Sequence, residues 1–167
     1  MGIAALIDGT TDVANSSRPM KDEEIEQARA NGIATLLRMV LNLERMADNA
    51  VNISQVTSRI GRDPLIKPLV DIPRMAQVTQ RMVKDAPDAY IHKNTQLANK
   101  VINDDDEVDQ LHARIFRELL TIMMEKPPTI TQATHLILVS RYLERIADHA
   151  TNIAEEVIFL VTGEKNK

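Results

Sequence analysis

An eleven-residue segment occurs twice in the chain, and this repeat limits what the sequence can fold into. Residues 43–53 read LERMADNAVNI, and residues 143–153 keep eight of those eleven letters. Both copies contain Glu-x-x-x-Asp, as Glu44 with Asp48 and Glu144 with Asp148. Residues four apart lie about one turn apart on the same face of an α-helix. The repeat therefore predicts one helical unit used twice, with a pair of acids on one face of each copy.

Apolar and small residues follow a heptad spacing through both copies. In the first copy they are Leu36, Met39, Leu43, Met46, Ala50, Ile53, Thr57 and Ile60. In the second copy they are Leu136, Val139, Leu143, Ile146, Ala150, Ile153, Val157 and Leu160. Steps that alternate between three and four residues are typical of long helices in a bundle. Because aromatic residues make up only 2% of the chain, aliphatic seams must build the core, and an all-α fold is predicted.

Glycine and proline divide the rest of the chain into further helices. Gly61 ends the first repeat helix, and the Pro127-Pro128 pair forces a turn before the second. Between these two turns we expect helices at about residues 65–84 and 88–125. Pro87 is expected to kink or split the chain between them, because proline cannot donate a helical hydrogen bond.

The composition excludes several classes of function. The 167 residues carry a net charge of −4 with dispersed Lys and Arg, which argues against nucleic-acid binding. The absence of Cys excludes disulfides, thiolate nucleophiles and thiolate-ligated metals. No membrane span or secretory signal is visible, so a cytoplasmic protein is expected. Residues 1–22 show no sustained period and are interpreted as a disordered leader or a foreign segment.

The repeated acids flank the apolar seam and do not lie in it. With Leu143 at heptad position a, Glu144 falls at b and Asp148 at f, where solvated charge is the ordinary finding. Acids at this spacing repel each other by roughly 0.2–0.5 kcal/mol in an isolated helix. The same unfavourable pair is nevertheless present in both copies, which favours a function for it.

A third acidic pair lies on the helix predicted before the Pro127-Pro128 turn. Asp105 and Asp109 stand 22 and 18 residues before this turn, while Asp148 and Glu144 stand 20 and 16 residues after it. In antiparallel helices the two pairs would differ in level by roughly 3 Å. Four carboxylates that meet in this way would repel strongly without a cation between them. The sequence therefore predicts a metal site at these four acids.

The ligand types indicate the class of metal. Oxygen ligands without cysteine favour hard ions such as Mg²⁺ or Mn²⁺, with Fe and Zn²⁺ as alternatives. His149 follows Asp148 directly, but Asn49 replaces it in the first copy. His149 is therefore interpreted as an ordinary helix-surface residue.

Two segments resemble one known family. Residues 141–164, RYLERIADHATNIAEEVIFLVTGE, closely resemble the last helix of PhoU-type phosphate regulators. Residues 101–111, VINDDDEVDQL, resemble the acidic helix of the same family. In that family, each of two three-helix bundles carries a Glu- or Asp-x-x-x-Asp motif, and multinuclear metal clusters lie on the bundle surface. The resemblance implies metal ligands at Asp105, Asp109, Glu144 and Asp148, with Glu44 and Asp48 in the first copy.

The resemblance also implies an architecture. Residues 65–164 look like a complete second PhoU bundle, and residues 23–62 look like the last helix of an incomplete first bundle. Residues 1–22 contain no counterpart of the family's first two helices, so Glu44 and Asp48 lack the acids expected opposite them. The chain would then be a fragment, a mis-started product, or a subunit that completes the bundle with another.

The function implied by the resemblance is regulatory. PhoU-type proteins restrain phosphate uptake and the phosphate-starvation response, and are thought to contact the ATPase subunit of a phosphate ABC transporter and a membrane sensor histidine kinase. The chain is thus expected to be a non-enzymatic cytoplasmic adaptor that reaches the membrane only through its partners. Part of its first repeat helix would lack cover, which predicts a homo-oligomer. The residues concerned are Leu36, Met39, Leu43, Met46 and Ile53.

Two alternative hypotheses use the same acids. Carboxylate-rich bundles can host di-iron enzymes, but those sites use Glu-x-x-His pairs, and no Glu precedes a His by three residues in this sequence. The second alternative is a PhoU-like cytoplasmic module or tail associated with a sodium–phosphate cotransporter. Phosphate ABC transporter genes beside this gene would favour the adaptor, and a cotransporter fragment upstream would favour the tail.

Overall fold

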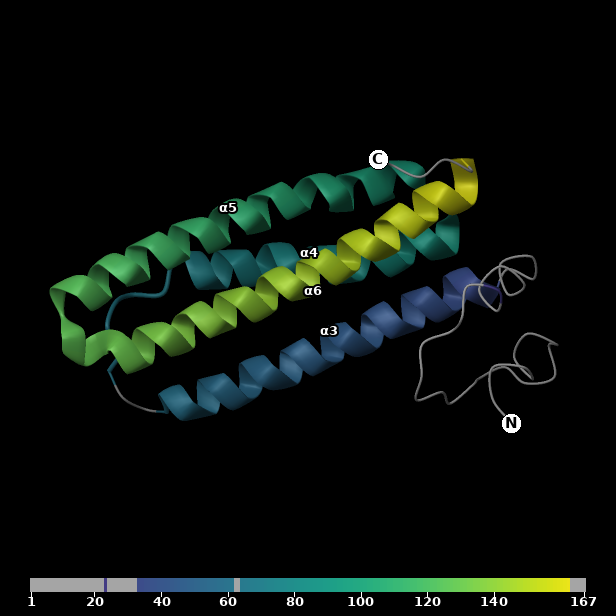
Figure 1. Ribbon diagram of the computed structural model, residues 1–167. Coiled ribbons are helices and arrows are strands. Elements are labelled where there is room, and N and C mark those ends of the chain that lie inside the picture. The colour runs from purple at the N-terminus through teal and green to yellow at the C-terminus, as the bar shows by residue number, and fades with distance from the viewer. Residues whose placement is uncertain (1–22, 24–32, 62–63, 163–167) are drawn as a thin grey trace, which may run out of the picture. The chain divides into compact units, whose positions relative to one another are not determined.

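The structure is a computed structural model that describes residue 23, residues 33–61 and residues 64–162. Its α-helices are α3 (Ile33–Ile60), α4 (Asp71–His92), α5 (Thr95–Glu125) and α6 (Ile130–Thr162), and a 3-10 turn, η1 (Pro127–Thr129), precedes α6 (Figure 1). No strand occurs in these ranges, which confirms the all-α prediction. The predicted leader, residues 1–22, lies outside the described residues.

The chain divides into two compact units, residues 1–41 and residues 42–167. In the first unit, the described part of α3 exposes apolar side chains, with Leu36 at 44%, Val40 at 50% and Leu41 at 49%. The second unit contains the rest of α3 together with α4, α5 and α6.

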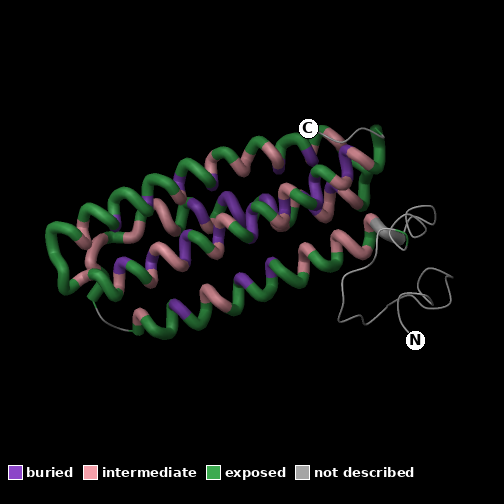
Figure 2. Tube along the Cα trace, viewed as in Figure 1, coloured by how far each residue is buried: buried purple, intermediate pink, exposed green. Residues whose placement is uncertain are grey.

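Helices α4, α5 and α6 pack pairwise into a three-helix bundle. The residues that they bury (Figure 2) are almost all apolar, with Thr79 and Ser140 as exceptions. The best-covered ones include Met75, Val78 and Met82 of α4, Val101, Val108 and Leu119 of α5, and Ile153 and Val157 of α6. The seam predicted for α6 is buried at every position from residue 136 to residue 157, and only Leu160 is exposed. The heptad spacing therefore located the core of this bundle.

The seam of α3 is only partly covered within the second unit. Met46, Asn49 and Val56 are buried, whereas the predicted seam residues Ala50 and Thr57 are exposed. The prediction that α3 buries the same seam as α6 is wrong at these two positions. The reason is that α4, α5 and α6 pack closely with one another and less closely with α3, so only one side of α3 is enclosed.

A groove of ≈ 570 Å³ lies between α3, α4 and α6. Its walls are mostly apolar and include Leu43, Met46 and Ile53 of α3, Val83 of α4, and Leu143 and Ile146 of α6. The groove explains why α3 is only partly covered, because no side chain fills this space between α3 and the two bundle helices.

The break between α4 and α5 lies beyond Pro87, and the predicted boundary is wrong. α4 continues through Pro87, and the chain turns at Lys93, whose φ is 49°. The Asn94 side chain then caps α5 by accepting a backbone amide hydrogen bond at 3.0 Å. A proline inside a helix costs about 3 kcal/mol. Burial of Ala86 and Ala89 on either side of it opposes this cost and favours a continuous helix.

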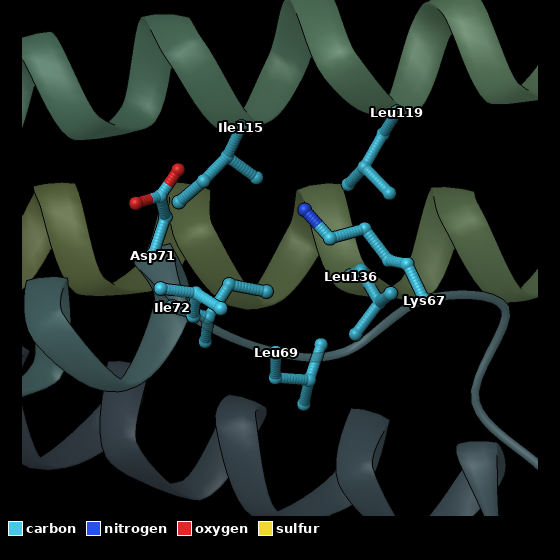
Figure 3. Close-up of a pocket in the computed structure, with 8 residues that line it drawn as sticks. Lys67, Leu69, Asp71, Ile72, Ile115, Leu119 and Leu136 are labelled. Carbon is cyan, nitrogen blue, oxygen red and sulfur yellow. The ribbon is translucent and has the colours of Figure 1, made fainter.

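The connector that precedes α4 packs closely over the bundle. A cavity of only ≈ 10 Å³, about the space of one water molecule, remains beneath it. Leu69 and Ile72 face Ile115, Leu119 and Leu136 around this space (Figure 3).

Polar contacts hold the same connector in place. The Ile66 amide donates to Gln132 Oε1 at 2.6 Å, and Lys67 pairs with Glu118. α4 begins at Asp71 and not at the predicted residue 65. The reason is that Pro68 disfavours helical geometry in the residue before it.

Two predicted turns are confirmed. Gly61 follows α3 with a φ of 67°, and its amide donates to the Thr57 carbonyl at 3.2 Å. Glycine is favoured in this left-handed conformation after a helix. The Pro127-Pro128 pair forms η1 and reverses the chain between α5 and α6. This reversal brings the acidic faces of the two helices together.

Candidate metal centre

Asp105 of α5 lies in a group of acids that includes Asp148 of α6. Burial raises the pKa of Asp105 from 3.8 to about 6, together with the charges of Asp109, Asp148 and Asp106. The Thr151 side chain partly opposes this rise by lowering the pKa. These influences come from both antiparallel helices joined by η1. The structure therefore brings Asp105 close to two of the other predicted ligands.

Asp148 links the two predicted acid pairs. Burial, followed by the charge of Glu144, raises the pKa of Asp148. The charges of Arg141, His149 and Arg145 oppose this rise. Asp148 thus interacts with Glu144 on its own helix and with the acidic group of α5.

Glu144 has two partners that the sequence analysis missed. Arg141 forms an ion pair with it on the same helix, and His112 Nε2 of α5 lies 3.7 Å from its carboxylate. His112 Nδ1 is in turn 3.0 Å from Ser140 Oγ. His112 and Glu144 stand 15 and 16 residues from the Pro127-Pro128 pair. Counting residues from the turn, as for the acids, therefore places His112 beside Glu144.

Several buried oxygen atoms at this acidic face lack a hydrogen-bond partner. They are Oδ2 of Asp104, Oδ1 of Asp105 and Oγ1 of Thr151; the Thr151 hydroxyl lowers the pKa of Asp105 but does not form a hydrogen bond of ordinary geometry with it. A buried oxygen without a partner carries a desolvation penalty that a bound cation would relieve. Carboxylate and hydroxyl oxygens are ligands of hard ions, so the donor set fits the predicted class of metal.

The side chains do not form a finished coordination shell. Within the described residues, no three His, Asp or Glu side chains are placed so that they could hold one ion. Asp109 and Asp148 are exposed, whereas Asp105 is half-buried. The assignment of Asp105, Asp109, Glu144 and Asp148 as metal ligands therefore stays a prediction.

The acids of the first copy have different surroundings. Glu44 and Asp48 are both exposed on α3. In the part of the chain that the structure describes, neither carboxylate lies with two other His, Asp or Glu side chains that could bind the same ion. As metal ligands, Glu44 and Asp48 also stay a prediction.

His149 is half-buried and connects α6 to α3. Its Nδ1 lies 3.0 Å from Asn42 Oδ1. Burial and the charge of Arg45, with a smaller contribution from Arg145, lower the pKa of His149, while Asp148 opposes them. His149 is therefore more than the ordinary surface residue that the sequence indicated.

Comparison with known proteins identifies the family of this bundle. The model of the PhoU domain matches residues 72–157, just over half of the chain. The chain belongs to the PhoU family. Two relatives are named phosphate-specific transport system accessory protein PhoU homolog. The one from Clostridium acetobutylicum is 39% identical over 133 residues, which cover 80% of this chain and 61% of the relative. The one from Caulobacter vibrioides is 45% identical over 130 residues, which cover 77% of this chain and 56% of the relative.

Solved structures of PhoU proteins share the fold. PhoU from Pseudomonas aeruginosa superposes with a TM-score of 0.72 at 35% identity, covering 86% of this chain and 73% of that one. The phosphate transport system regulatory protein PhoU from Streptococcus pneumoniae gives a TM-score of 0.74 at 23% identity, covering 81% and 64%. The predicted PhoU-like bundle with one additional long helix is thereby confirmed.

Two further facts bear on the whole protein. The chain spans only 56% to 61% of the length of the two PhoU homologs named above. Among the described helices, none combines the length and the apolar character that crossing a membrane requires.

Proposed function

We propose that the protein is a non-enzymatic regulatory adaptor that restrains phosphate uptake and phosphate-starvation signalling. Its partners would be the ATPase subunit of a phosphate ABC transporter and a sensor histidine kinase, which it would reach from the cytoplasm. The observation that carries this proposal is membership of the PhoU family, since relatives at 39% and 45% identity are named as accessory proteins of phosphate-specific transport systems. The exposed acidic face of α5 and α6 supports a role in binding.

Complementation tests this function. In a bacterial strain that lacks its own PhoU, the chain should lower a phosphate-starvation reporter when phosphate is plentiful. A full-length PhoU serves as the positive control, and copurification with the ATPase subunit or with the kinase identifies the partner. Equal reporter activity with and without the chain, at matched protein levels, would contradict the proposal.

We also infer that the α5 and α6 acids of this adaptor hold a divalent or trivalent cation, namely Mg, Mn, Fe or Zn. The cation would neutralise the clustered carboxylates and satisfy the buried oxygen of Asp105. Asp105 and Asp148 would hold it from opposite helices, with Asp109 and Glu144 as neighbouring ligands. The site would thus fix the side chains of α5 relative to those of α6.

Elemental analysis of protein purified without chelators tests the metal. Replacing Asp105 and Asp148 with Asn should remove most of the bound metal. The matched control is Glu125→Gln with Glu155→Gln, which removes two exposed acids from the same two helices. A third variant, Glu44→Gln with Asp48→Asn, measures any contribution of the first copy. Unchanged metal content in the Asp105 and Asp148 variant would refute the assignment.

Homo-oligomerisation is a separate part of the proposed function. Val40 and Val51 of α3 are 50% and 54% exposed, and the groove beside α3 is apolar. Sedimentation equilibrium at micromolar concentration should show self-association that Val40→Glu with Val51→Glu abolishes. Met124→Glu is the control, because Met124 is an exposed apolar residue on α5. A wild-type protein that stays monomeric would contradict this part alone.

A further inference from the structure

The two copies of the repeat meet where α3 and α6 lie side by side in the second unit. The helices run in opposite directions there (Figure 1), and the hydrogen bond between Asn42 and His149 spans them at 3.0 Å. From Asn42 to Arg45 the chain advances three residues along α3, about 4.5 Å. From His149 back to Arg145 it retreats four residues along α6, about 6 Å in the same direction. Arg45 and Arg145 therefore lie at nearly the same level.

Helical spacing also places both arginines on the side of their helices that carries this contact. Arg45 is three residues from Asn42, and Arg145 is four residues from His149. The charges of Arg45 and Arg145 both lower the pKa of His149, which agrees with this placement. Two equivalent positions of the repeat thus place two positive charges near His149.

Neither guanidinium forms an ion pair with a carboxylate of the described residues. Arg45 and Arg145 are exposed, and neither side chain forms an ion pair or a hydrogen bond with a described residue. By contrast, Arg74, Arg114 and Arg141 of the same unit each pair with an acid. Asp48 and Asp148 follow the two arginines by three residues. Neither carboxylate forms an ion pair with its arginine, although the charge of Arg145 lowers the pKa of Asp148.

We propose that Arg45 and Arg145 form a binding site for a small tetrahedral oxyanion, with inorganic phosphate as the ligand, where α3 and α6 lie side by side. Guanidinium groups present parallel N–H donors that match the oxygens of phosphate and bind it in a bidentate manner. An anion between the two arginines also removes the repulsion between two like charges. His149 acts as a positioning residue, since its hydrogen bond to Asn42 holds α3 beside α6.

This site uses side chains other than the predicted metal ligands, so the two can fail independently. A phosphate ion held by a metal at Asp105 and Asp148 would need those acids. A phosphate ion held by the two arginines would not. The Asp105→Asn with Asp148→Asn variant therefore separates the two sources of phosphate binding.

The test is isothermal titration calorimetry of the whole chain with inorganic phosphate, at constant ionic strength and after chelator treatment. The wild type should bind one phosphate per chain, and sulfate should compete because it shares the tetrahedral oxyanion geometry. Arg45→Gln or Arg145→Gln should each weaken binding by about tenfold or more, as expected for loss of a hydrogen bond to a charged group. The double variant should show no binding. Lysine at both positions should retain part of the affinity, since the charge stays and the fork is lost.

Control variants guard against general charge effects. Arg59→Gln removes an exposed arginine from α3, and Arg81→Gln removes one from α4. Both should bind phosphate within about twofold of the wild type, because their ordinary contribution is long-range and screened by salt. Circular dichroism should show that each variant keeps its helices. Absence of phosphate binding at millimolar concentration overturns the proposal. Equal weakening by Arg59→Gln, or loss of binding in the Asp105 and Asp148 variant, overturns it as well.

Discussion

The two copies of the repeat have nearly the same letters and different surroundings. Ala150 and Ile153 of α6 are 0% and 1% exposed, whereas Ala50 of α3 is exposed and Ile53 is half-buried. α6 is enclosed by α4 and α5, while α3 packs less closely against the same bundle. The repeat therefore specifies which face of a helix is apolar, and the neighbouring helices determine how much that face contributes to stability.

The largest expected difference is at the paired isoleucines. Ile153→Ala should destabilise the protein by about 2–5 kcal/mol, because the side chain is fully buried and a cavity would remain. Ile53→Ala should cost about 1 kcal/mol or less, because Ile53 already borders an open groove. Urea unfolding followed by circular dichroism measures both values. Equal losses would show that α3 is as well enclosed as α6.

Adding volume at the paired alanines tests the same difference in the opposite sense. Ala150→Leu should destabilise the protein by about 1–3 kcal/mol, since no space is free at a fully buried position. Ala50→Leu should change the free energy of unfolding by less than about 0.5 kcal/mol, because Ala50 lines the groove. Thermal unfolding of the two variants provides the measurement. A large loss from Ala50→Leu would mean that another part of the protein fills the groove.

The smallest expected effect concerns the acids and is seen as a dependence on pH. The pKa of Asp105 is raised from 3.8 to about 6, so the folded protein holds this proton more tightly than the unfolded chain does. The stability that it contributes is fully present below pH 3.8 and is lost as the pH rises through 6. In metal-free protein, Asp105→Asn should therefore be more stable than the wild type at pH 8, by less than about 1 kcal/mol because the carboxyl is partly solvated.

The exposed acid of the first copy is the control for this pH effect. Asp48→Asn is the matched variant, because it removes an exposed carboxylate from α3. Chemical unfolding at a series of pH values measures both variants after chelator treatment. If both substitutions changed the pH dependence equally, burial would not distinguish the two acidic faces.

Local rules predicted much of the fold and of the candidate site. The buried seam of α6, the glycine after α3 and the proline turn at η1 each depend on residues a few positions apart. The proximity of Asp105 and Asp148 also followed from local counting, because a short turn fixes the levels of antiparallel helices. Such features are readable because backbone geometry alone determines them.

The features that sequence analysis missed depend on packing between distant segments. Pro87 alone indicated a break, yet buried alanines around it favour a continuous α4. Met46 and Asn49 are buried while Ala50 is exposed, because the cover of α3 depends on how other helices reach it. The contact of His112 with Glu144 is different, because it follows from the same counting of levels across η1 that pairs the acids.

The short η1 turn also affects the order in which the protein assembles. Only four residues separate α5 from α6, so these helices make contacts that are local in sequence. Contacts of this kind form quickly, in microseconds to milliseconds for helical bundles. The hydrogen bond from Asn42 to His149, by contrast, joins residues 107 positions apart. During folding we therefore expect the acidic face of the α5–α6 hairpin to form before α3 docks, so transient undocking of α3 would leave that face intact.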